Sequence, residues 1–95
     1  MTQRQLTTVE LSAKYPPDAN GFISFGDIAR GECNQQCQYA SEYVYGFDGR
    51  PNLGDGLRFD RYELGKNNYH ALLIHIEDAA EFVRRYHAHR AALLL

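Results

Sequence analysis

The chain has few of the residues and segments that assign a protein directly to a class. It contains two cysteines, three prolines and no tryptophan among its 95 residues. No segment approaches the roughly 18 apolar residues that a membrane-spanning helix needs, and the N-terminal sequence MTQRQLTTVE has no apolar core of a secretory signal. We therefore expect a cytoplasmic protein with no membrane segment, in which both thiols stay reduced.

Charge of neither sign dominates the composition. The chain has 10 basic and 12 acidic residues, for a net charge of −2. A nucleic-acid-binding domain usually carries an excess of basic residues, so this balance does not favour one. Hydrophobic residues make up 44% of the chain, which is enough for one core. With no repeat and no low-complexity segment, residues 1–95 are predicted to form a single domain, with a flexible polar stretch at residues 1–5.

The common catalytic and phosphate-binding motifs are also missing. The chain contains neither G-x-S-x-G nor G-x-x-x-x-G-K-[ST], and no acidic spacing that fits an EF-hand. The glycine-rich segment GFDGRPNLGDG contains Asp48 and Asp55, whose negative charges would repel a phosphate. We interpret this segment as a turn-rich loop and predict no cofactor.

The two cysteines lie four residues apart, in the segment ECNQQCQYASEYVYG. Cys33, Cys37, Ala40 and Val44 recur at the spacing of one side of an amphipathic helix, which Gly46 would end. Cβ atoms at this helical spacing are about 5–6 Å apart, whereas a disulfide needs about 3.5–4.5 Å. The pattern therefore predicts two free thiols in the core.

A small metal- or thiol-dependent enzyme is a further interpretation of these cysteines. A zinc site with four ligands would need two histidines in addition. His70 and His75 are five apart on an expected strand and face opposite sides, and His87 and His89 lie roughly 200° apart around an expected helix. Neither pair converges, and the stripe places both thiols inward. We therefore predict no metal and no catalytic residue.

Alternating side chains indicate a strand near the N-terminus. In VELSAKY, residues 9–15, apolar and polar residues alternate as in a half-buried strand, and Pro16 and Pro17 end it. The segment GFISFGDIARGE then permits either a strand over residues 22–25 or a short helix over residues 25–30. The helix would begin at Ser24, with Asp27 three residues later as in a capping box, and end at Gly31.

The second half of the chain predicts a hairpin followed by a helix. LRFDRYEL and NYHALLIHI flank GKNN, as expected for two antiparallel strands and a short turn. Asp78 and Glu81 form a capping box for a last helix, in which Glu81 precedes Arg85 by four residues, the favourable order for an ion pair. The expected inner side of this helix consists of Ala79, Phe82, Val83, Tyr86, Arg90 and Leu93.

These elements predict an α+β fold. A small antiparallel sheet, made of the N-terminal strand and the β-hairpin, would be packed by two or three helices in the order β-α-α-β-β-α.

The segment FGDIARGECNQQCQYASEYVYG has the outline of a helix-turn-helix, and the hairpin after it would be a wing. Its second helix carries Gln35, Gln36, Gln38 and Glu42 but no Lys or Arg. Phosphate contacts provide much of the affinity of DNA-binding proteins, and the basic cluster RRYHAHR lies on the last helix instead. A winged helix-turn-helix-like DNA-binding regulator is therefore the alternative.

Three tyrosines follow the second cysteine. On a helix, Tyr39 and Tyr43 lie on one flank of the apolar stripe and Tyr45 on the other, so all three are predicted at the boundary of the core or outside it. Tyrosine is enriched in protein interfaces, because it supplies contact area and a hydroxyl at low entropic cost. In a chain without tryptophan, tyrosines equally complete the edge of a core, and both interpretations stay open.

Together these patterns favour a small non-enzymatic protein-binding module whose partner is a host or cellular protein. One hypothesis is an inhibitor encoded by a phage or another mobile element, which acts by steric occlusion. The C-terminal AALLL would allow the last helix to form a homodimer. The predicted partner-binding residues are Tyr39, Tyr43, Tyr45, Gln35, Gln38, Glu42, Asp48 and Asp55.

Overall fold

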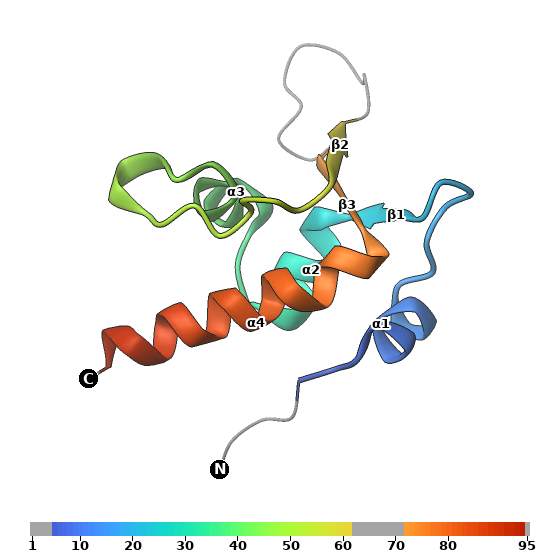
Figure 1. Cartoon of the computed structure of the whole chain (residues 1–95), viewed down its shortest axis with the longest axis horizontal. Coiled ribbons are helices and arrows are strands. Elements are labelled where there is room, and N and C mark those ends of the chain that lie inside the picture. The colour runs from blue at the N-terminus through green and yellow to red at the C-terminus, as the bar shows by residue number, and fades with distance from the viewer. Residues whose placement is uncertain (1–4, 62–71, 95) are drawn as a thin grey trace.

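The protein has an α+β fold in which helices pack on a small antiparallel sheet (Figure 1). The computed structural model describes residues 5–61 and 72–94. Within these ranges the elements follow one another as α1 (Thr8–Lys14), β1 (Phe22–Ser24), α2 (Phe25–Glu32), α3 (Cys37–Tyr45), the 3-10 helix η1 (Phe47–Gly49), β2 (Phe59–Arg61), β3 (Leu72–His75) and α4 (Ile76–Leu93). No helix in the described ranges is long and apolar enough to cross a membrane.

The sheet has β3 at its centre. β1 and β2 pair antiparallel with the two edges of β3, so that Ile23 and Phe59 both lie opposite Ile74. The predicted pairing of the two hairpin strands is therefore confirmed, while the expected GKNN turn lies outside the described residues. Leu72, Leu73 and Ile74 are all buried, so β3 is covered on both faces.

The predicted strand over residues 9–15 is wrong, because this segment is the helix α1. Thr7 and Glu10 form a reciprocal capping box: the Glu10 amide donates to the Thr7 hydroxyl at 3.2 Å, and the Thr7 amide donates to the Glu10 carboxylate at 3.0 Å. The two bonds satisfy amides that would otherwise lack partners at the helix start. Leu11 is buried, whereas Val9 is 77% exposed, so the alternation did not correspond to two faces of a strand.

Residues 22–32 contain both of the structures that the sequence permitted, one after the other. β1 covers residues 22–24, and Ser24 then caps α2 by accepting a hydrogen bond from the Asp27 amide. The prediction that Gly31 ends this helix is wrong, because α2 continues to Glu32. A Cβ at position 31 would overlap the hydroxyl of Tyr15, so glycine there permits α2 to approach the residue that follows α1.

The helix predicted from Cys33 onwards begins later, at Cys37. Asn34 adopts a left-handed conformation (φ 54°), and the amides of Cys33 and Gln35 both donate to the carbonyl of Ala29 at the end of α2. Residues 33–36 are therefore a tight turn between two helices. The apolar stripe is nevertheless buried as expected, and Gly46 (φ 78°) ends α3.

The last helix begins two residues before the predicted capping box. The imidazole of His75 caps α4 by accepting from the Glu77 amide at 3.1 Å, whereas Asp78 accepts from both the amide and the guanidinium of Arg58, at 2.9 and 2.8 Å. The expected pair of Glu81 and Arg85 is confirmed at 2.7 Å.

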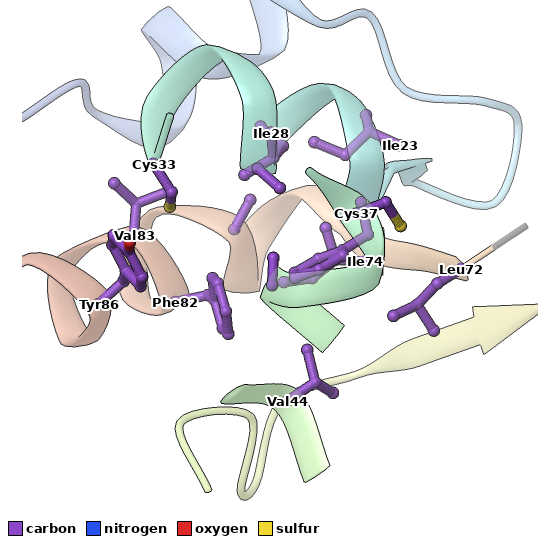
Figure 2. Packing of buried hydrophobic residues seen from close by; sticks show 14 of the residues in the cluster. Ile23, Ile28, Cys33, Cys37, Val44, Leu72, Ile74, Phe82, Val83 and Tyr86 are labelled. Carbon is purple, nitrogen blue, oxygen red and sulfur yellow. The ribbon is translucent and has the colours of Figure 1, made fainter. Parts of the chain in front are cut away.

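One hydrophobic core joins the helices α1 to α4 and the three strands (Figure 2). Phe82 of α4 is fully buried, and its ring packs edge-on against Phe25 of α2 and Phe59 of β2. The predicted inner side of α4 is correct as far as Tyr86. Arg90 and Leu93 are exposed because the C-terminal part of α4 extends beyond the core (Figure 1).

Candidate protein-binding surface

Exposed aromatic side chains lie on α3 and on η1. Tyr39 is 50% exposed, and Tyr45 and Phe47 are 41% and 60% exposed. The rings of Tyr45 and Phe47 are in contact, with centroids 5.8 Å apart. Figure 1 shows the segment after α3 projecting at the left of the view, away from the sheet. We refer to Gln38, Tyr39, Tyr45, Phe47 and Asp48 as the α3–η1 surface.

Tyr43 does not belong to this surface, and its predicted position at the boundary of the core is wrong. Its side chain is 7% exposed, and its ring packs edge-on against Tyr86 and contacts His89, with centroid distances of 5.4 and 5.6 Å. The guanidinium of Arg50 lies 5.4 Å from the centre of the same ring. Because α4 covers this flank of α3, Tyr43 becomes part of the core.

The predicted polar residues divide into outward and inward groups. Gln38 is exposed, and its amide contacts Gln36 at 3.4 Å. Gln35 turns toward α4 and donates to the Tyr86 hydroxyl at 2.9 Å. Glu42 forms an ion pair with Arg50 at 3.4 Å. Gln35 and Glu42 therefore make contacts within the protein, and only Gln38 of these three belongs to the α3–η1 surface.

The loop after α3 is held from α4. One guanidinium nitrogen of Arg85 donates to the carbonyls of Leu53 and Asp55, at 3.0 and 2.7 Å. The Leu53 amide donates to the Tyr43 carbonyl, and a Cβ at Gly54 would lie 2.8 Å from the Val44 carbonyl. These contacts fix the loop closely against the end of α3.

The two aspartates of this loop are exposed. Asp48 lies in η1 with a left-handed backbone (φ 56°), which Asp tolerates better than most side chains. In the described residues, no cation lies within ion-pair distance of the carboxylates of Asp48 or Asp55. Asp48 directly follows Phe47 in η1, whereas Asp55 lies in the loop beyond it, so we group only Asp48 with the exposed aromatic residues.

The sequence did not predict Phe47 as a partner-binding residue, because it lies inside a glycine-rich segment. Two left-handed residues flank it, Gly46 (φ 78°) and Asp48. Such a backbone reverses direction within a few residues and turns the intervening side chain outward. A single large apolar residue between turn-forming residues was the available signal.

The thiols are free and buried, as Figure 2 shows for both Cys33 and Cys37. Burial raises the pKa of the Cys33 thiol to about 12, and burial also raises the pKa of the Cys37 thiol. A nucleophilic cysteine needs a lowered pKa, so these environments disfavour thiol catalysis. In residues 5–61 and 72–94 no group of three metal-ligating side chains is found, and His70 lies outside them.

The order of elements around α3 is the order found in a helix-turn-helix with a wing. α2 and α3 are joined by the turn at residues 33–36, and β2 and β3 come next in the chain. The basic cluster on α4 is partly neutralised, because Arg84 and Arg85 both bind Glu81. At the end of α4, Leu93 and Leu94 are 62% and 87% exposed.

Comparison with known proteins adds no assignment to these observations. No protein-family model, no curated protein and no solved structure gives a significant match to the chain.

Proposed function

We propose that the protein is a non-enzymatic protein-binding module and that its α3–η1 surface contacts the partner. The observation that carries this proposal is the exposure of three aromatic side chains on α3 and η1, those of Tyr39, Tyr45 and Phe47. Aromatic side chains dominate the binding energy of many interfaces, because they bury a large area with few rotatable bonds.

The chemistry of α3 supports a protein partner over DNA. The helix over residues 37–45 contains no Lys or Arg, although it occupies the place of the second helix in a helix-turn-helix. Its exposed positions carry Gln38 and two tyrosines instead. A partner would desolvate the tyrosines at the centre of the contact, while polar side chains around them set the register.

The mechanism that we propose is steric occlusion. A domain that binds its partner through this surface would block the site that the partner presents there, without any chemical step. The partner that we propose is a host or cellular protein, and one hypothesis is that a phage or another mobile element encodes the inhibitor.

Affinity capture from a lysate of the native host tests the proposal, with nuclease and high salt in parallel. We expect a stoichiometric protein that survives both treatments and whose affinity falls by about 1 kcal/mol or more in each of Tyr39→Ala and Tyr45→Ala. Val9→Ala, which removes an exposed apolar side chain from α1, is the matched control and should retain full affinity. A captured protein that binds all four chains equally would contradict the proposed surface.

DNA binding is the second candidate, and the connectivity of α2, α3 and the β2–β3 hairpin favours it. A DNA-binding protein would retain short duplex DNA with an affinity that falls steeply with salt. Arg90→Ala on the basic cluster would weaken that binding. Nucleic acid recovered in the capture experiment and lost at high salt would favour this candidate over the first.

A further inference from the structure

The turn that leads into β1 contains an asparagine directly followed by a glycine. Asn20 is exposed, and Gly21 is the residue before β1. Asparagine is chemically labile. It reacts fastest before glycine, because glycine has no side chain to shield its amide nitrogen from the asparagine side chain. The other asparagines of the sequence precede Gln, Leu, Asn or Tyr, so Asn20 is the most reactive of them.

The fold requires the glycine of this pair. Gly21 has a left-handed backbone (φ 87°), which residues with a side chain rarely adopt. A Cβ at this position would lie 2.6 Å from Nε2 of His75, which is too close for a van der Waals contact. The Gly21 carbonyl also accepts from the Ile76 amide at 2.7 Å, where α4 begins. The residue that makes Asn20 labile is therefore one that the packing of β1 against β3 and α4 needs.

Asp18 holds the nitrogen that would react. The Gly21 amide donates to the Asp18 carbonyl at 3.0 Å. The Asp18 carboxylate accepts from the amides of Asn20 and Phe22, at 2.8 and 3.0 Å. For the Gly21 nitrogen to attack the Asn20 side chain, the backbone between the two residues has to rotate and the Gly21 amide has to release its bond. The hydrogen bonds of Asp18 therefore oppose the reaction.

We infer that Asn20 is a site of spontaneous deamidation in the folded protein and that the turn built by Asp18 limits its rate. The Gly21 nitrogen gives its proton to solvent and forms a bond with Cγ of Asn20, while the Cγ–Nδ2 bond breaks and ammonia leaves. Water then opens the five-membered imide at either carbonyl, which gives aspartate or isoaspartate. Both products add a negative charge, and isoaspartate also adds one carbon to the backbone just before β1. This inference is independent of the proposed function.

Incubation of the full chain in mildly alkaline buffer, followed by peptide mapping with mass spectrometry, tests the inference. We expect the Asn20 peptide to show the mass change of an amide converted to an acid, and to contain isoaspartate. Peptides with Asn34 and Asn52 should stay unchanged over the same time. Asp48 and Asp55 also precede glycines, but isomerisation of an aspartate leaves its mass unaltered, so the mass change assigns the reaction to an asparagine. Asn20→Ser should abolish it.

Asp18→Ala tests the control by the turn, because it removes the two carboxylate bonds and retains the backbone carbonyl. We expect the Asn20 peptide to deamidate about fivefold faster or more in this variant. Asp27→Ala is the matched control: Asp27 is an exposed aspartate on α2 that pairs with Arg30 at 2.8 Å, and its loss should leave the rate unchanged. Unchanged hydrogen exchange at the Ile74 amide, in the central strand, would show that the turn opens and not the whole protein.

An unmodified Asn20 peptide in the folded chain, after a time in which the same chain in urea has deamidated there, would overturn the inference. Equal or faster reaction at Asn34 or Asn52 would overturn it as well. If Asp18→Ala and the wild type react at the same rate, the turn does not limit the reaction and that part of the inference is wrong.

Discussion

At the scale of single residues, neighbours on one helix have opposite environments. Tyr43 and Tyr45 are two positions apart in α3, yet Tyr43 is 7% exposed and Tyr45 is 41% exposed. The difference arises from α4, whose Tyr86 and His89 cover one flank of α3 and leave the other open. We therefore expect Tyr43 to affect the stability of the protein and Tyr45 to affect only the proposed binding.

Replacement of each tyrosine by alanine should show this separation. We expect Tyr43→Ala to lower the free energy of unfolding by roughly 3 kcal/mol, because it opens a cavity beside Tyr86. Tyr45→Ala should change it by less than about 1 kcal/mol, as is usual for a surface position. Urea denaturation of both variants measures the difference. Equal losses would mean that Tyr45 is as much a part of the core as Tyr43.

Cys33 makes the stability of the folded protein depend on pH in the alkaline range. Burial raises the pKa of its thiol from an ordinary value of 9.0 to about 12 in the folded state. The unfolded chain therefore loses this proton at lower pH than the folded protein does. The stability that the group contributes is complete below about pH 9, the unfolded pKa, and is lost as pH rises toward about 12, at about 1.4 kcal/mol per pH unit.

Comparison of the wild type with Cys33→Ala isolates this effect. Between about pH 8 and about pH 10, we expect the free energy of unfolding to fall by about 1 kcal/mol more in the wild type than in the variant. The raised pKa values of Lys14 and Tyr15 act in the same direction, but they are common to both chains and cancel in the difference. Parallel pH profiles would show that Cys33 ionises normally in the folded protein.

At the scale of elements, one arginine of α4 contributes two of the hydrogen bonds that hold the loop after α3. Arg85 donates to the carbonyls of Leu53 and Asp55 and also binds Glu81. Arg84, its neighbour, binds the same Glu81 but makes no contact with the loop that the structure shows. The hydrogen bonds of these two arginines lower the pKa of Glu81 to about 2, so the carboxylate stays charged at neutral pH.

Substitution of each arginine by glutamine therefore distinguishes support of the loop from the ion pair on α4. We expect Arg85→Gln to accelerate hydrogen exchange at the amides of Leu53 and Leu57 about tenfold, because the loop loses its two bonds to α4. Arg84→Gln should leave these amides unchanged. Similar exchange in both variants would indicate that the loop is held by its own turns and by packing alone.

At the scale of the whole molecule, α4 extends beyond the hydrophobic core. The core side chains of α4 extend to Tyr86, and the helix continues to Leu93 with exposed alanines and leucines. Leu93 and Leu94 are 62% and 87% exposed, which leaves apolar surface in water. The homodimer predicted through this helix stays a prediction, and it can be measured directly.

Sedimentation equilibrium should show weak self-association that depends on this end of α4. We expect the apparent mass to rise with protein concentration in the wild type and to stay monomeric when Leu93→Ser and Leu94→Ser are combined, because two leucines supply only a few kcal/mol of burial. Val9→Ser, at an exposed apolar position on α1, is the control and should associate as the wild type does. A constant monomer mass for all three chains would exclude the homodimer.

Patterns that depend only on near neighbours in the chain were readable from the sequence. The apolar stripe of Cys33, Cys37, Ala40 and Val44, the end of α3 at Gly46 and the pair of Glu81 and Arg85 all follow from helical spacing or from backbone freedom at glycine. The α+β fold and the pairing of β2 with β3 followed from the same local signals. Of the candidate surface, the exposure of Tyr39, Tyr45 and Gln38 was predicted correctly.

The tertiary structure decided which residues are buried where two distant segments pack together. The helix α1 is a local signal that was missed rather than a tertiary effect: the capping box of Thr7 and Glu10 favours a helix where alternation suggested a strand. Tyr43 is buried because Tyr86 and His89 of α4 pack against it, whereas Phe47, in the turn after α3, is exposed. Sequence spacing fixes which side of an element a residue occupies, whereas its burial depends on which distant element packs there.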